Sequence, residues 1–278
     1  MHSKNERSEQ DRTIKHIVRN LLPKTAVLWF AVAVIGQWLF ATYVALFYGG
    51  AAINNDFMKW NRVLPHGYVE GETMGNLAVG IHVFFAAVIL FGGPLQFIPF
   101  IRNRFKAFHR LNGRFYLITM VLVSISGIYM VLTKGTISGL VGDISVSING
   151  VLILVFAYLT LRFALQRKFE KHGQWAFRLF LVANGVWFFR IGLMFWLLIH
   201  GRPVGFDPET FTGPFLVVLG FGQYLIPIAV YEGYRKAIKS GGLWQPLGST
   251  LIMIMAITIT AIGIFAATLG MWLPRISG

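Results

Sequence analysis

Residues 76–100 have the sequence NLAVGIHVFFAAVILFGGPLQFIPF, a run of 25 positions without Lys, Arg, Asp or Glu. An α-helix rises about 1.5 Å per residue, so a helix of this length crosses the roughly 30 Å hydrocarbon core of a bilayer. A transmembrane barrel would show alternating segments of about 10 residues instead of a continuous apolar run. The stretch therefore predicts a transmembrane helix.

Six further stretches share this length and apolar character: about 25–48, 113–133, 144–166, 175–199, 214–234 and 246–273. Backbone polar groups in hydrocarbon must be paired within the protein, and helices joined by short connections achieve this. We therefore predict an all-α polytopic membrane helix bundle of about seven transmembrane helices. The chain divides into a polar basic tail (1–24), a single transmembrane domain (25–273) and a short outer tail (274–278).

The composition supports a membrane protein. Of the 278 residues, 55% are hydrophobic and 13% are charged, whereas a soluble domain carries about 25% charged residues. The absence of cysteine excludes disulfides, thiolate catalysis and Cys-ligated metals. The net charge of +14 comes from basic clusters between apolar runs, and no basic–aromatic surface module is evident. The lipid bilayer is therefore the expected partner, and no nucleic-acid partner is expected.

The basic residues also predict the orientation. The connections on the side of the N-terminus hold 18 Lys and Arg, and those on the other side hold 5. The positive-inside rule then places the N-terminus in the cytoplasm and the C-terminus outside. We expect a multi-pass protein of the bacterial cell inner membrane without a cleavable signal peptide, because the first apolar run is too long for one. Trp60, Trp244 and Trp272 fall near the predicted interfaces, as in an aromatic belt.

The longest connection, 49–75, lies on the predicted outer side. It is long enough either to be a simple polar connector or to cover the outer mouth as a partial lid. The last apolar stretch has small residues about four positions apart: Ala256, Thr260, Gly263, Ala266, Ala267 and Gly270. Such spacing lets helices approach closely, within the bundle or between the subunits of a homo-oligomer.

Polar side chains inside the spans are candidates for ligand binding, because hydrocarbon disfavours them. In the outer half, His82 lies roughly 9 Å below the outer boundary and Arg190 roughly 14 Å from it, so one cavity could hold both. A guanidinium keeps its proton, and no carboxylate lies at that depth. Arg190 is therefore satisfied either by carbonyls and water or by an anion. Gln96 and Asn184 are further candidates in spans.

The inner side contains a repeated pattern. His109 is followed by Arg114 and His172 by Arg178, each pair at the cytoplasmic start of a predicted helix. Helix N-termini present free N–H groups and a positive dipole end, which favour anions. The layer is thus either an anion-binding site or a positive-inside anchor, and Glu232 could pair with one of its arginines.

The same two histidines, His109 and His172, are candidate metal ligands, because two histidines on neighbouring helices can hold haem b from both faces. A haem would make a quinone or another redox partner possible. No motif of a serine hydrolase, a P-loop nucleotide hydrolase or a zinc protease is present, so the sequence leaves enzyme activity open.

The region from Gly80 to Lys236 resembles a bacterial family of uncharacterised multipass predicted membrane proteins, a domain of unknown function. Three motifs carry the resemblance: His82 leading into Gly93-Pro94-Leu95-Gln96-Phe97, then His109-Arg110-x-x-Gly113-Arg114-x-Tyr116, and His172-x-x-Trp175-x-x-Arg178. It implies a membrane location and no particular activity.

A helix-start His followed by Gly also resembles cytochrome b561-type haem bundles, with a match on the third and fifth spans and no matching His on the fourth. This second resemblance implies haem b. From the sequence we therefore expect an integral inner-membrane protein that binds an anionic small molecule or lipid in a polar intramembrane site. The alternative is a haem-b membrane electron carrier.

Overall fold

The computed structural model describes residues 2–64 and 66–277, and the side chains within 13–64 and 66–277. Over these ranges the regular structure is helical and the predicted all-α class is confirmed; the only β-type pairing there is the bridge between Asp207 and Thr212. The elements are α1 (His2–Val44), η1 (Ala45–Gly49), α2 (Gly50–Ile53), η2 (Phe57–Arg62), α3 (Thr73–Leu95), α4 (Pro99–Arg104), α5 (Lys106–Lys134), α6 (Gly139–Leu165), α7 (Phe169–Ala183), α8 (Gly185–His200), α9 (Pro214–Lys239), α10 (Trp244–Ala267), η3 (Thr268–Trp272) and α11 (Leu273–Ser277).

The predicted number of spans is confirmed. Within the described residues, six helices are long and apolar enough to cross a membrane, and the bent pair α7–α8 makes a seventh if it is one span. The structure differs from the sequence prediction at this pair, because 175–199 is not one straight helix but bends by 51° at Asn184. The Asn184 side chain donates a hydrogen bond from Nδ2 to the Phe180 carbonyl at 2.7 Å. Such side-chain bonds to the backbone compete with the helical ladder and bend helices.

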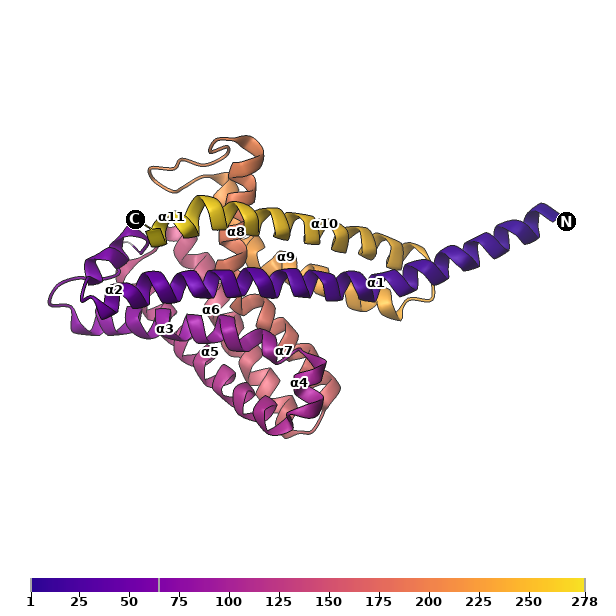
Figure 1. Ribbon diagram of the computed structural model, residues 1–278, viewed down its shortest axis with the longest axis horizontal. Helices are drawn as coiled ribbons and strands as arrows, with labels where there is room; N and C mark the ends of the chain where they lie inside the picture. The colour runs from indigo at the N-terminus through magenta and orange to yellow at the C-terminus, as the bar shows by residue number, and fades with distance from the viewer. Residues whose placement is uncertain (1, 65, 278) are drawn as a thin grey trace.

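The first helix is longer than its apolar stretch. α1 begins at His2, so residues 2–24 of the basic tail predicted at 1–24 form the start of this helix, and its first turns project from the bundle (Figure 1). Leu22 is buried against Ala237 of α9 and Met253 of α10. The basic N-terminal segment is therefore joined to the transmembrane helix without a break.

The helices form two groups that diverge toward one end of the molecule. α1 and α10 lie side by side and run in the same direction, and α10 also packs on α8 (Figure 1). α3 packs on α5, and α6 packs on both α5 and α7. At the end that carries α4, the group containing α5 and α7 is spread away from α1 (Figure 1).

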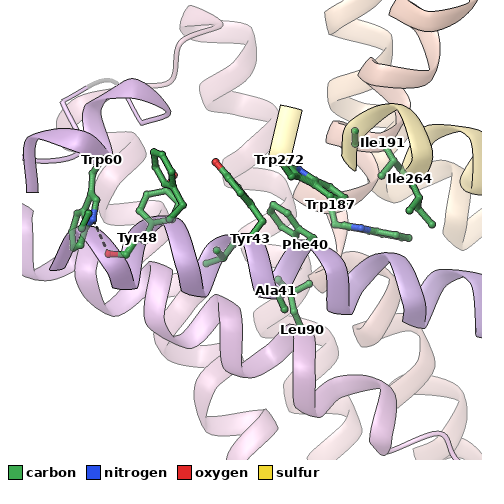
Figure 2. Close-up of a cluster of buried hydrophobic side chains, with 14 of the residues drawn as sticks. Phe40, Ala41, Tyr43, Tyr48, Trp60, Leu90, Trp187, Ile191, Ile264 and Trp272 are labelled. Carbon is green, nitrogen blue, oxygen red and sulfur yellow. Dashed lines mark hydrogen bonds between the residues drawn. The ribbon is translucent and has the colours of Figure 1, made fainter. Parts of the chain in front are cut away.

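An aromatic core fills the other end of the bundle. Phe40 and Tyr43 of α1, Trp187 of α8 and Trp272 of η3 are all buried there (Figure 2). Trp60 of η2 packs on the same core and donates a hydrogen bond from Nε1 to the Tyr48 carbonyl at 3.1 Å. The 49–75 connection therefore covers this end of the core.

The structure corrects two of the three tryptophans assigned to an aromatic belt. Trp60 and Trp272 are 6% and 1% exposed, so they are core residues, whereas Trp244 is 79% exposed, as a belt residue would be. Their positions near span ends do not reveal which face of the helix points inward.

The small residues of α10 and of η3, which follows it and contains Gly270, pack within the chain. A Cβ placed on Gly263 would lie 2.5 Å from the Ile191 carbonyl oxygen, and one on Gly270 would lie 2.8 Å from the Met194 Cε. Both partners belong to α8. The stripe therefore seats α8 on α10, and the homo-oligomer stays a prediction.

Candidate functional site

A large cavity lies between the two diverging groups of helices. Its volume is about 1710 Å³, and its walls come from α1 and from α4 to α10. It extends from His109 and His172, near the starts of α5 and α7, to Trp196 and Phe215, near the end of α8 and the start of α9. We call this cavity the groove.

Aromatic rings from four parts of the chain make one wall of the groove. Phe30 of α1, Phe97 before α4, Phe177 of α7 and Tyr231 of α9 all line it. The Phe97 and Phe177 centroids are 5.3 Å apart, and those of Phe177 and Tyr231 are 4.7 Å apart. Their surface suits an apolar chain. None of these residues is a sequence candidate, because Phe is common in every span.

The mouth of the groove, near the starts of α5 and α7, is basic. Arg102, Arg110 and Arg114 line the groove there together with His109 and His172. None of the three arginines forms a salt bridge with any residue whose side chain the structure describes. One carboxylate, that of Glu170, lies at the same mouth and accepts a hydrogen bond from Gln174. The mouth therefore has excess positive charge. Arg102 and Arg110 are not among the ligand residues predicted from the sequence, where both count toward the orientation and Arg110 also belongs to the second family motif.

The two inner histidines lie in the same cavity. His109 is within electrostatic reach of His172 and of Arg102. The Nδ1 atom of His172 lies 3.0 Å from the Thr160 carbonyl oxygen, so this nitrogen carries a proton and donates it. That bond holds the ring of His172 and leaves its Nε2 available to a ligand.

The histidine pair does not fit a haem held from both faces. A metal-ligating His almost always donates its second ring N–H to an acceptor. His172 has such an acceptor in Thr160, but the buried Nδ1 of His109 has none among the described residues. Both axial histidines need such an acceptor to fix the orientation of the ring, and among the described residues only His172 has one.

Arg178 is already occupied by a carboxylate. Its Nε and Nη2 lie 2.8 Å and 2.7 Å from Oε1 of Glu232, whose other oxygen is 3.2 Å from Arg235. The guanidinium also lies over the Trp175 ring, at 4.5 Å from its centroid. Glu232 thus pairs with Arg178, one of the arginines of the repeated His-then-Arg pattern. This ion pair joins α7 to α9.

Of the amide candidates Gln96 and Asn184, Gln96 lines the groove. Its Nε2 is buried without a hydrogen-bond partner in the described chain, and a Cβ on Gly113 would lie 3.2 Å from its Oε1. Asn184 lies instead at the bend between α7 and α8 and does not line the groove. Gln96 therefore supplies a free polar group beside the basic mouth.

The two outer candidates, His82 and Arg190, lie away from the groove. His82 contacts the Val123 carbonyl at 3.1 Å and so links α3 to α5. It lies within electrostatic reach of Arg190, in line with the expectation that the two share the outer half. Arg190 does not line the groove but lies over the Phe40 ring, 5.1 Å from its centroid. The candidate residues thus fall into an inner group and an outer group.

The fold defines a polytopic helical membrane protein with a groove between its helices. A family model described as predicted membrane protein (DUF2306) matches residues 79–226, which is more than half of the chain. The chain therefore belongs to this predicted membrane protein family of unknown function, as the sequence resemblance indicated. No curated protein and no solved structure matches the chain. The likeness to cytochrome b561-type bundles receives no support.

Proposed function

We propose that the protein binds an anionic amphiphile, a phosphate-bearing membrane lipid, in the groove. Its head group lies at the basic mouth and its acyl chain along the aromatic wall. The observation that carries the proposal is the position of Arg102, Arg110 and Arg114 on one apolar cavity, without carboxylate partners among the described side chains. One arginine side chain can bind two phosphate oxygens at the same time, and helix N-termini such as those of α5 and α7 favour phosphate.

The dimensions and the charge of the groove favour this ligand over smaller or neutral ones. Its volume of about 1710 Å³ exceeds the roughly 300–1,000 Å³ of pockets for drug-sized molecules. An anionic metabolite without a tail would leave the aromatic wall uncovered. A quinone would fill the wall but would leave the basic mouth without a counter-charge. A lipid with a charged head group satisfies both parts.

Lipids with brominated acyl chains test the proposal, because bromine quenches tryptophan on contact and Trp29 and Trp196 line the groove. We expect brominated phosphatidylglycerol to quench the wild-type protein more strongly than brominated phosphatidylcholine. Replacing Arg102, Arg110 and Arg114 together with Gln should lower the relative affinity for phosphatidylglycerol roughly a hundredfold, because each of the three charges contributes about 1 kcal/mol near a phosphate surface and about 1.4 kcal/mol is tenfold in affinity.

A matched control separates the groove from general surface charge. Lys168, Lys236 and Lys239 are exposed and do not line the groove. Their joint replacement with Gln removes the same three charges and should preserve the preference for phosphatidylglycerol. Equal losses in both triple variants, or equal quenching by the two lipids in the wild type, would contradict a groove-bound anionic lipid.

We also propose that the protein lies in the bacterial inner membrane with its N-terminus in the cytoplasm. The support is the excess of Lys and Arg on the side of the N-terminus, counted over short connections. A reporter enzyme that works only outside the cytoplasm should be active after Gly278, and a cytoplasmic reporter should be active in the 240–243 connection. The reverse pattern would overturn the orientation and would place the basic mouth on the outer side.

A further inference from the structure

Arg190 carries a partly buried positive charge in the apolar helix α8. Its guanidinium donates a hydrogen bond from Nη1 to the Val186 carbonyl of its own helix, at a long 3.3 Å. No salt bridge among the described side chains involves Arg190. A guanidinium has five N–H donors and keeps its proton, and an unpaired charge at membrane depth is costly. The residue therefore needs a negative partner.

Aromatic side chains of α1 and η3 surround this charge. The Arg190 Cζ lies 5.1 Å from the centroid of Phe40, and the Phe40 ring lies 5.2 Å from Trp272 and 6.0 Å from Tyr43. Tyr43 and Tyr48 are within electrostatic reach of the guanidinium. Figure 2 shows Phe40, Tyr43 and Trp272 gathered between α1 and the C-terminal end of the chain.

Two of these side chains present buried donors that nothing in the described chain accepts. The Trp272 Nε1 and the Tyr43 hydroxyl have no hydrogen-bond partner among the described residues, and the residues are only 1% and 2% exposed. An indole N–H can only donate. Buried donors are normally satisfied, so orphans beside an unpaired cation indicate an absent acceptor. These donors are independent of the charge on Arg190 and point to the same kind of ligand.

A second positive charge strengthens the inference. Arg275 of α11 lies within electrostatic reach of Arg190, and it too forms no salt bridge with a described side chain. Two cations with N–H and O–H donors favour an anion as ligand. The rings pack against one another at ordinary distances, which excludes a lipid head group among them and restricts the ligand to a small ion.

We infer that Arg190, Trp272 and Tyr43 form a binding site for a monatomic anion, chloride under physiological conditions. The ion accepts hydrogen bonds from the guanidinium, the indole and the phenol, and it compensates the charge of Arg190 within the membrane. Because these groups come from α8, η3 and α1, the bound ion joins three segments far apart in the sequence. The site is separate from the groove, which none of the three residues lines.

Thermal unfolding of the purified full-length protein in detergent, at constant ionic strength, tests the site. Sodium chloride should raise the unfolding midpoint saturably above the value in sodium gluconate, because a ligand of the native state stabilises it by mass action. Sodium bromide should replace chloride, and phosphate should not. Arg190→Met should abolish the chloride effect, and Trp272→Phe and Tyr43→Phe should each weaken the apparent affinity roughly tenfold.

The control is Arg202→Met, which removes an exposed arginine from the connection after α8 and should keep the full chloride effect. Trp272→Phe and Tyr43→Phe each keep an aromatic ring and remove one donor, so they test the anion site even if Arg190→Met fails to fold. Equal midpoints in chloride and gluconate for the wild type would overturn the site. So would unchanged chloride titrations in Trp272→Phe and Tyr43→Phe, or a phosphate effect equal to that of chloride. The triple variant of the groove arginines should retain the chloride effect. A failure of the anion site can therefore be told apart from a failure of the lipid-binding groove.

Discussion

Replacing Gly263 with valine is expected to destabilise the bundle more than a valine elsewhere in α10. A Cβ at this position would lie 2.5 Å from the Ile191 carbonyl oxygen and 3.1 Å from the carbonyl carbon, which are backbone atoms of α8. Neither can rotate away, so α8 and α10 must separate. Overpacking of this kind costs about 1–3 kcal/mol, and in a membrane the helices depend on close packing for their association.

Gly248 provides the matched control in the same helix. Nothing lies within 4 Å of a Cβ placed there, so Gly248→Val adds the same side chain without a clash. Thermal unfolding in detergent, followed by tryptophan fluorescence, should show a clearly lower midpoint for Gly263→Val than for Gly248→Val. Equal midpoints would mean that α8 does not pack on α10 through this glycine.

Replacing Glu232 with glutamine should destabilise the protein by about 1–2 kcal/mol. Loss of one partner of a fully buried ion pair costs about 3–5 kcal/mol, but the Glu232 side chain is 34% exposed, and solvent screening lowers the value. Arg178, at 13% exposure, would lose its carboxylate and keep its charge. Its contact with the Trp175 ring would remain.

A double-mutant cycle isolates this pair. Arg178→Met combined with Glu232→Gln should cost less than the sum of the single changes, because in the double variant Arg178 is no longer present as a charge without its carboxylate. Arg235→Gln, which removes the longer 3.2 Å contact, should have a smaller effect than Arg178→Met. Strict additivity of the two single changes would contradict an energetic coupling between α7 and α9 through this ion pair.

The spans were predictable from the sequence because continuous apolar character over about 20 residues has few structural alternatives. The bend at Asn184 was not, since averaging over an apolar run hides one polar residue whose side chain bonds to the backbone. The exact ends also differ, as α9 continues to Lys239 beyond the predicted 234. A search for apolar runs stops at the first charged residues, so it misses the turns at helix ends that carry charge.

The candidate site was predictable in part. A His at the same depth in two parallel helices suggested a shared place, and His109 and His172 do line one groove. The free arginines were not distinguished from the paired one: Arg178 follows the same motif as Arg114, yet only Arg178 faces Glu232. Which face of a helix a residue occupies relative to its neighbours depends on tertiary packing, and no single-sequence pattern reports it.

Native mass spectrometry of the full-length protein tests the central claim most directly. The protein is delipidated in detergent, exposed to equal amounts of phosphatidylglycerol and phosphatidylcholine, and then released from the micelles in the spectrometer. We expect one phosphatidylglycerol to remain bound to the wild type, and little to remain on the variant with Gln at positions 102, 110 and 114. Equal retention of the two lipids, the same retention by that variant, or a mass increment of haem in place of lipid would contradict the account.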